Sequence, residues 1–297
     1  MNGSYTLRQN RFEVNDLDIK STVESAQPIT FLADYDFENG TLAYVSAGRL
    51  IKCRFRGNGK ICRVGIECKD AAFARKDFIG RFRLKDDMED IYSNIATDSF
   101  ITSSIKHYRG MRLTLNDPWE TTFCFIVSQY NNIKRIRRIV KRFMNEFGHD
   151  VFDENNNIIA KGFPTSEELM QLSENDFRRC GVGFRARYIK EAVECCTYNI
   201  DLYSMRKRSY DRIKNELMEI SGIGEKVADC IALMGYGKME AFPIDVWVKR
   251  TLERVYFSGK NKKINELREF VEQNWSNKYL GYVQQYMFWG GRNMMIS

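Results

Sequence analysis

Residues 217–245 of the chain read LMEISGIGEKVADCIALMGYGKMEAFPID, and this stretch decides how the rest is arranged. Its centre, SGIG at 221–224, separates two segments in which apolar residues recur at helical spacing. Those residues are Ile213, Leu217, Ile220, Val227, Ile231 and Met234. We therefore predict two short amphipathic helices over 211–234 that meet at a glycine hairpin.

The glycines of this hairpin suit a phosphate ligand. Gly222 and Gly224 permit positive φ and carry no Cβ, so backbone N–H groups at the start of the second helix can face outward. No Gly-Lys-Ser/Thr sequence follows, and the glycines come after a helix, so neither a nucleotide P-loop nor a Rossmann turn fits. We expect a DNA or RNA backbone here, bound by Gly222, Gly224 and Val227.

Two residues of the stretch add a reactive group. Lys226 falls in the first turn of the second helix, where the helix dipole and a partly dry pocket favour the neutral amine that can attack carbon. Asp245 ends the segment FPID and is placed to cap a helix beginning at Val246. Its carboxylate could activate the amine or stabilise an oxocarbenium ion. We predict that Lys226 and Asp245 form a catalytic pair.

The segments GIGEKVADC at 222–230 and PIDV at 243–246 resemble the helix-hairpin-helix DNA glycosylases with the Gly/Pro-Asp signature, and among them the 8-oxoguanine DNA glycosylase branch. The resemblance implies that Lys226 is the nucleophile and Asp245 its partner. It also implies an α+β fold, with an N-terminal antiparallel sheet domain with helices over 1–115. All-α helix-hairpin-helix glycosylase domains follow over 116–297, with the catalytic Asp loop at 242–246.

Composition limits the class of protein. Of 297 residues, 43% are hydrophobic and 29% charged, which is typical of a globular chain, and no apolar run reaches the roughly 18 residues of a membrane span. The N-terminal sequence lacks an apolar signal-peptide core, so we expect a cytoplasmic protein, nucleoid-associated if prokaryotic. The net charge of +7 gives a moderate attraction to polyanions.

The eight cysteines include no CxxC pair, so we expect reduced thiols rather than a zinc site or a disulfide framework. None follows Cys230, so the iron–sulfur loop of the endonuclease III and adenine-glycosylase relatives is missing. The expected reaction requires no metal or cofactor.

The N-terminal part has a strand pattern over about 29–68. Asn39-Gly40 and Gly57-Asn58-Gly59 mark turns, and residues 50–55 partly alternate between apolar and basic. Helices are expected at 86–96 and 100–108. Before the strands, Ser25-Ala26-Gln27 matches the Ser-Gly-Gln by which the related enzymes recognise N7–H of 8-oxoguanine. Ala26 still offers the carbonyl, although its Cβ disfavours positive φ; an ordinary strand edge is the alternative.

From residue 116 the apolar residues recur at helical spacing. Helices are predicted at 118–128 and 131–147, and the second carries a basic run over 134–142 that either binds phosphate or is a solvated face. By resemblance, Asn131, Asn132 and Arg135 contact DNA, although Tyr130 replaces the usual asparagine. The turn at 181–188 is expected to project Phe184 and Arg185, with Phe184 as the wedge that fills the gap left by a flipped base. A core position for Phe184 is the alternative.

The C-terminal segment YLGYVQQYMF at 279–288 predicts an aromatic-rich helix, whose ordinary role would be core packing. By resemblance, Gln284 reads the Watson–Crick edge of the base, and Phe288 and Cys230 enclose its two faces. Trp247 stands where many relatives have a phosphate-contacting histidine.

The sequence thus predicts a monomeric base-excision repair enzyme that removes 8-oxoguanine from duplex DNA and then cleaves the strand through a Lys226 Schiff base. Two alternatives remain: an alkylated-base glycosylase of the same fold, against which Lys226 argues, and a non-catalytic helix-hairpin-helix DNA-binding protein.

Overall fold

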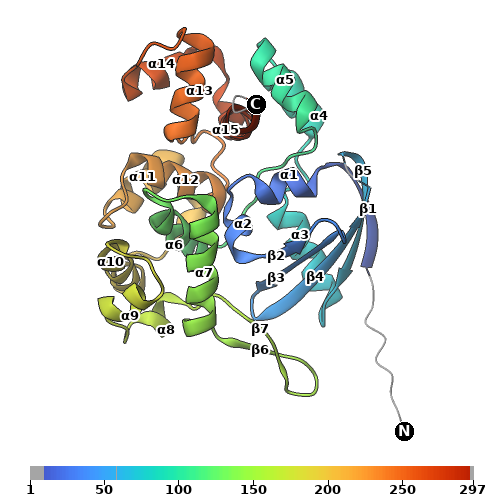
Figure 1. Ribbon diagram of the computed structural model, residues 1–297, viewed down its shortest axis with the longest axis vertical. Helices are drawn as coiled ribbons and strands as arrows, with labels where there is room; N and C mark the ends of the chain where they lie inside the picture. The colour runs from blue at the N-terminus through green and yellow to red at the C-terminus, as the bar shows by residue number, and fades with distance from the viewer. Residues whose placement is uncertain (1–9, 58, 295–297) are drawn as a thin grey trace.

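The computed structural model describes residues 10–57 and 59–294. Residues 1–9, where the sequence lacks a signal-peptide core, and Asn58 of the predicted turn lie outside the described residues. Figure 1 shows a sheet on one side of the molecule and helices stacked along the other. None of the helices in the described part combines the length and apolar character that a membrane crossing requires.

The predicted antiparallel sheet is confirmed. It has five strands in the order β1-β5-β4-β3-β2. Their bounds are Asn10–Leu17 (β1), Asp34–Asp36 (β2), Thr41–Ser46 (β3), Arg49–Arg56 (β4) and Gly59–Glu67 (β5). In β4 the side chains of Ile51, Cys53 and Phe55 are buried and alternate with exposed basic ones.

Five helices accompany the sheet: α1 (Ile19–Glu24), α2 (Pro28–Leu32), α3 (Ala71–Arg81), α4 (Met88–Ile95) and α5 (Ser99–His107). Two of them, α4 and α5, were predicted. The prediction of strand from residue 29 is wrong at its start, because Pro28 occupies the first turn of α2, where its missing N–H costs nothing.

The remaining chain is mainly helical. Its helices are α6 (Pro118–Ser128), α7 (Ile133–Phe147), α8 (Ser166–Leu169), α9 (Glu174–Arg179), α10 (Arg185–Tyr198), α11 (Tyr210–Met218), α12 (Glu225–Tyr236), α13 (Val246–Tyr256), α14 (Ile264–Asn274) and α15 (Leu280–Met294), with short 3₁₀ turns at Ser204–Lys207 and Asn277–Tyr279. One correction is needed: strands β6 (Asp150–Phe152) and β7 (Ile158–Lys161) form a hairpin in this region, which the all-α prediction omitted.

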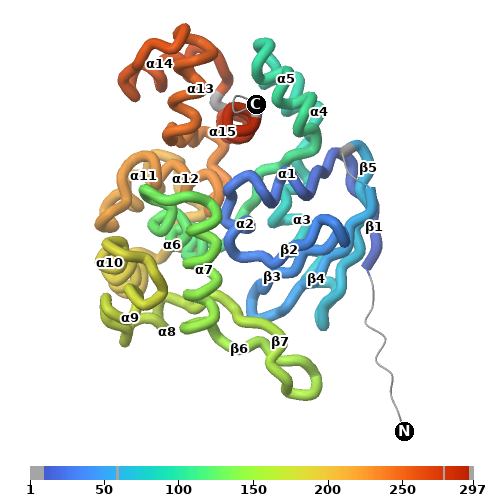
Figure 2. Tube along the Cα trace, in the orientation of Figure 1, coloured from blue at the N-terminus to red at the C-terminus, as the bar shows by residue number. Residues whose placement is uncertain are grey.

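Two hydrophobic cores hold the fold. One lies between the sheet and α3 and includes Phe78 and Phe82. The other joins the helices, and it includes Ile91 of α4 and Ile101 of α5, which pack beside α15 (Figure 2). The domain boundary near residue 115 stays a prediction; these two helices precede it and belong to the second core.

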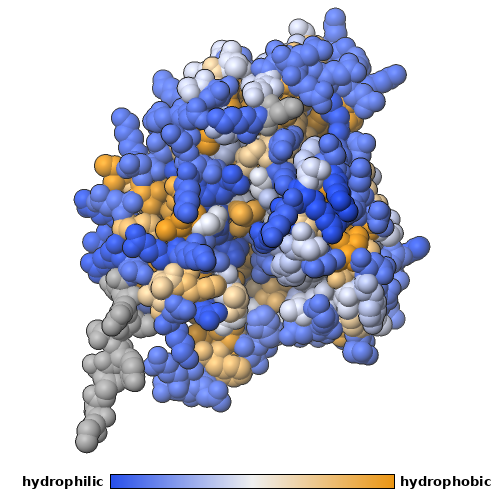
Figure 3. All heavy atoms as spheres, turned by 180° about the vertical axis from the view of Figure 1, so that it is seen from behind, coloured by the Kyte–Doolittle hydropathy of each residue, from blue (hydrophilic) through white to orange (hydrophobic). Residues whose placement is uncertain are grey.

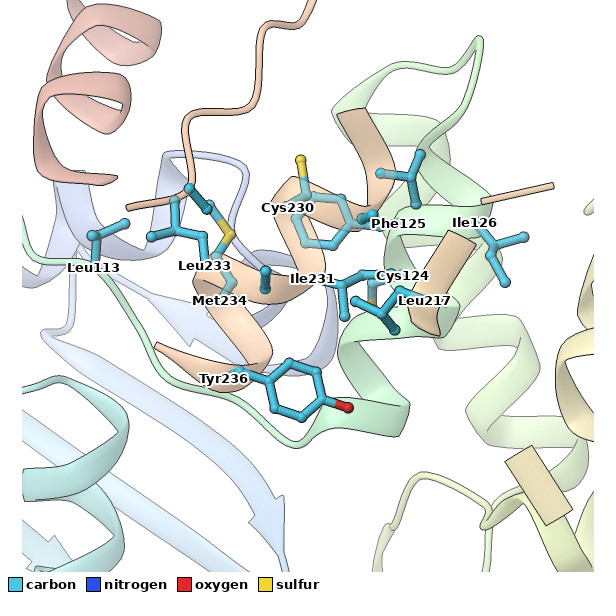
Figure 4. Packing of buried hydrophobic residues seen from close by; sticks show 14 of the residues in the cluster. Leu113, Cys124, Phe125, Ile126, Leu217, Cys230, Ile231, Leu233, Met234 and Tyr236 are labelled. Atoms are coloured by element: carbon cyan, nitrogen blue, oxygen red, sulfur yellow. The ribbon is translucent and has the colours of Figure 1, made fainter. Parts of the chain in front are cut away.

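The centre of the helical core is the contact between α6 and α12. Figure 4 shows Cys230 of α12 beside Phe125 of α6, while Leu233 lies on the other side of α12, toward Leu113. Cys230 and Phe125 also line a pocket, so one end of this packed interface opens to the candidate site. The rear face of the molecule is mostly hydrophilic, with apolar residues in scattered patches (Figure 3).

Buried polar side chains fix the segments around that pocket. The Gln27 carboxamide donates to the Arg112 carbonyl at 2.9 Å and accepts from the Thr114 backbone N–H at 2.7 Å. The Asn116 backbone N–H donates to the Met234 carbonyl of α12 at 2.8 Å. The turn between α1 and α2 is thereby tied to the segment that leads into α6.

Candidate active site

The predicted glycine hairpin lies between α11 and α12. Gly222 has φ +80°, and a Cβ there would meet the Tyr188 ring at 2.4 Å. Gly224 differs from the prediction, because it caps α12 with φ −92° and does not use a left-handed conformation. A Cβ at Gly224 would meet nothing within 4 Å, so the approach to the start of α12 is open. Val227, whose N–H donates to the Gly224 carbonyl at 3.0 Å, is buried behind it.

Lys226 is the second residue of α12 and is half-buried. Its Nζ lies 5.9 Å from the centroid of the Phe125 ring. Cys230 is one helical turn further on, on the same side of α12. Burial raises the pKa of the Cys230 thiol to about 12, so this side chain enters the site as a neutral apolar group.

Asp245 caps α13, as predicted: its Oδ1 accepts from the Val248 backbone N–H at 2.8 Å. Burial raises the pKa of the Asp245 carboxyl, while the Val248 hydrogen bond and the charge of Lys226 act in the opposite direction. The carboxylate is therefore desolvated and oriented by a backbone donor beside a lysine.

One pocket of about 220 Å³ brings together many of the predicted residues. It is lined by Ala26, Asn131, Asn132, Lys226, Cys230, Asp245, Trp247, Gln284 and Phe288. These residues come from the α1–α2 turn, the segment before α7, and α12, α13 and α15. A larger cavity of about 1140 Å³, beside β1 and α4, contains none of the predicted site residues.

Gln284 is almost fully buried in α15, and its side-chain amide donates to the Pro243 carbonyl at 3.3 Å. Its Oε1 has no hydrogen-bond partner among the described residues. A buried acceptor without a donor is costly, so this oxygen suits a ligand that supplies an N–H. Phe288, one turn later, stacks on Trp289 with ring centroids 6.5 Å apart.

Ala26 adopts the left-handed conformation that the sequence made costly, with φ +61°. The neighbouring Ser25 carbonyl accepts from the buried Gln285 side chain at 2.9 Å, and Gln27 anchors the other side. No hydrogen bond to the Ala26 carbonyl joins it to another described residue. The turn thus keeps its strained form despite the Cβ, and it is not a strand edge.

The predicted wedge region lies at the start of α10. Phe184 is 53% exposed, and its ring meets that of Tyr130 edge to face at a centroid distance of 6.4 Å. The prediction that this turn projects Arg185 is wrong. Its guanidinium is buried and donates to the carbonyls of Gln129, at 2.9 Å, and Tyr130, at 3.2 Å.

Asn131, Asn132 and Arg135 lie in the segment that this arginine holds. The Asn132 side chain caps α7 by accepting from the Arg135 backbone N–H at 3.0 Å. Arg135 itself is exposed. Part of the basic run is structural, since Arg137 and Lys141 donate to the carbonyls of Ala33 and Leu32 at the end of α2.

Sequence reasoning missed several pocket residues, namely Phe31, Phe125, Ser128, Ile133, Ile136, Met234, Gln285 and Arg292, and it quoted Ser25 and Pro243 only as parts of their motifs. Most are apolar residues whose pattern gives only a core position. Within residues 10–57 and 59–294, no three His, Cys, Asp or Glu side chains are grouped to hold a metal ion.

Comparison with known proteins defines the class to which this fold and pocket belong. A model of the HhH-GPD superfamily of base excision DNA repair proteins matches residues 123–277, more than half of the chain, and the chain belongs to that superfamily. A probable N-glycosylase/DNA lyase of Methanothermobacter thermautotrophicus is 33% identical over 70% of this chain and 71% of its own length. The N-glycosylase/DNA lyase OGG1 of Arabidopsis thaliana is 29% identical over 89% and 77%.

Solved structures agree with this assignment. The structure of MBOgg1 with a low-affinity DNA ligand has a TM-score of 0.87 and 28% identity, and covers 97% of this chain and 99% of that one. The apo-form of Clostridium acetobutylicum 8-oxoguanine glycosylase/lyase has a TM-score of 0.83 and 25% identity over 95% and 97%.

Proposed function

We propose that this protein is a bifunctional DNA glycosylase and lyase of base excision repair that removes 8-oxoguanine from duplex DNA. The observation that carries the proposal is the single pocket in which Lys226, Asp245, Gln284 and Phe288 meet. Relatives named N-glycosylase/DNA lyase and 8-oxoguanine glycosylase/lyase support the same activity.

The start of α12 binds the DNA backbone, and the damaged nucleotide leaves the base stack to enter the pocket. At about 220 Å³ the pocket is smaller than the roughly 300 Å³ at the lower end of drug-sized ligand sites. It therefore suits one base, while the sugar and phosphates stay at its mouth. Phe184, exposed beside Tyr130, fills the vacated space in the duplex.

Lys226 performs the covalent chemistry. Its amine nitrogen bonds to C1′ as the bond from C1′ to the base breaks, and the base leaves with the bonding electrons and gains a proton. Opening of the sugar gives a Schiff base, and loss of a C2′ proton then expels the 3′ phosphate by β-elimination. Asp245 stabilises the positive charge that develops on the sugar.

Four residues select the base. The unpartnered Oε1 of Gln284 accepts from the N–H groups of the purine Watson–Crick edge. Phe288 and Cys230 enclose the base faces, and the Ala26 carbonyl accepts from N7–H, which guanine lacks. All of these residues come from one chain, so we propose that a monomer suffices.

The alternative of an alkylated-base glycosylase is not favoured, because such an enzyme relies on the aspartate and has no use for a lysine at position 226. The fold alone does not separate the two, since a 3-methyladenine DNA glycosylase of Archaeoglobus fulgidus has a TM-score of 0.79 at 19% identity.

A gel assay tests the proposal. End-labelled duplexes carrying 8-oxoguanine, a methylated purine or undamaged guanine are incubated with the protein, with and without alkali. We expect strand cleavage without alkali for the 8-oxoguanine duplex alone. Release of the methylated purine with no cleavage of the 8-oxoguanine duplex would overturn the proposal.

A further inference from the structure

Arg292 is a pocket residue that the sequence did not single out. It lies in the last turn of α15, one turn after Phe288, and lines the pocket together with Asp245 and Trp247. Its side chain is half-buried, and its charge is well placed at the carboxyl end of a helix. Arg292 therefore lines the same side of the pocket as the Asp245 carboxylate.

The guanidinium of Arg292 has no hydrogen bond or ion pair to another of the described residues. Its one ring contact is with Trp289, 5.7 Å from the guanidinium carbon to the ring centroid. Asp245 influences Arg292 through charge, raising its pKa against the lowering effect of burial, but Asp245 already accepts from Val248. A partly desolvated guanidinium thus keeps its planar donor set available.

The substrate brings one kind of anion to this side of the pocket. If a base occupies the pocket and its C1′ lies near Lys226, the phosphodiesters flanking that nucleotide are the nearest negative charges. A guanidinium pairs with phosphate oxygens through two parallel hydrogen bonds, which a point charge cannot do.

We propose that Arg292 forms a phosphodiester subsite, in which its guanidinium binds a phosphate next to the extruded nucleotide. This inference rests on the proposed function. It predicts a contact that is independent of the base, because a phosphate is present whatever base the nucleotide carries. Arg292 then anchors the substrate while Lys226 and Asp245 carry out the chemistry.

The test combines a protein variant with a modified duplex. Affinity is measured for wild type and Arg292→Gln, both carrying Lys226→Gln so that the strand stays intact, on duplexes with 8-oxoguanine or with a tetrahydrofuran abasic-site analogue. Each is prepared unmodified and with an uncharged methylphosphonate at the 5′ or the 3′ flanking phosphate. Arg54→Gln, on the exposed face of β4, is the control for the same loss of charge.

We expect Arg292→Gln to weaken binding of both unmodified duplexes by about ten-fold or more, and Arg54→Gln to change it little. The slope of log affinity against log salt should become shallower by about 0.9. One methylphosphonate duplex should bind wild type and Arg292→Gln almost equally, as a double-mutant cycle requires of a direct contact. Arg292→Lys keeps the charge but cannot make the two parallel hydrogen bonds of a guanidinium, so its affinity should lie between those of wild type and Arg292→Gln.

Three outcomes would overturn the inference. If Arg292→Gln bound all duplexes with the wild-type affinity, Arg292 would not contact a phosphate. A loss confined to the 8-oxoguanine duplex would mean that Arg292 reads the base. A lower single-turnover rate at saturating enzyme for Arg292→Gln, measured with Lys226 in place, and no change in affinity would mean that Arg292 acts on Asp245. Failure of the proposed function is separate, since wild type would then not cleave the 8-oxoguanine duplex at all.

Discussion

The Asp245 carboxylate is desolvated, and its protonation should limit the rate of the reaction at low pH. Because burial raises its pKa above the ordinary value of 3.8, protonation begins at a higher pH than for an exposed aspartate. Only the ionised form stabilises a sugar cation, so the single-turnover rate should fall as the pH is lowered through this raised pKa. A pH profile of that rate at saturating enzyme would measure the acid limb.

The variant Asp245→Asn isolates the charge, since asparagine still caps α13. We expect the rate to fall by about 10²-fold or more and the affinity for DNA to stay nearly unchanged. A large loss of affinity with an almost normal rate would contradict the assigned role.

Ala26 is an L-residue held at φ +61°. This conformation costs roughly 1–2 kcal/mol, whereas the extra freedom of an unfolded glycine costs about 0.4–1 kcal/mol. Ala26→Gly should therefore be as stable as wild type, or more stable by up to about 1.6 kcal/mol. Ala33→Gly, at φ −82°, relieves no strain and should be less stable. The stabilities of the two variants are compared by their midpoints of denaturant unfolding. Equal losses of stability in both variants would contradict a strained turn at Ala26.

At the scale of elements, the turn between α6 and α7 is held by Arg185 of α10. We propose that the exposed Arg135, at the start of α7, contacts the base opposite the lesion and gives a preference for cytosine there. Arg135→Ala should therefore abolish a preference for cytosine of about ten-fold or greater, because arginine donors match the acceptor edge of cytosine. Arg185→Ala should instead slow excision opposite every base. Single-turnover rates opposite all four bases measure this, and a selective loss in Arg185→Ala would refute the assignment.

The hairpin between α11 and α12 contains two glycines with different tasks. Gly222→Ala adds a Cβ in a left-handed residue, 2.4 Å from Tyr188, and should cost about 2–4 kcal/mol of stability. Gly224→Ala meets open space and should cost no more than about 1 kcal/mol. It should nevertheless weaken DNA binding, since the methyl group stands where the backbone approaches. The free energy of unfolding and the affinity for duplex DNA are measured for both variants. Normal DNA binding by Gly224→Ala would mean that the DNA backbone does not approach Gly224.

For the molecule as a whole, the sequence predicts local features best. The cap at Asp245 and the alternation in β4 depend on neighbouring residues, and the structure has both of them. The pairing of Lys226 with Asp245 could be proposed because a proline and two glycines fix the backbone around them.

Features that depend on distant residues could not be predicted. The inward turn of Arg185 is set by carbonyls 55 and 56 positions earlier in the chain. Ala26 keeps its conformation because Gln27 reaches a segment 85 residues away. Arg292 has no sequence signal at all, since one arginine near a helix end is ordinary, and only the fold places it beside Asp245.

The central claim is that Lys226, brought by the fold into one pocket with Asp245 and Gln284, attacks C1′ of an oxidised nucleotide. Borohydride reduces a Schiff base to a stable amine, so adding it during turnover of an 8-oxoguanine duplex should link the protein to the DNA. We expect wild type to give this covalent product and Lys226→Gln to give none, while Lys226→Gln still binds the duplex. Trapping of Lys226→Gln at the wild-type level would place the nucleophile elsewhere and contradict the account.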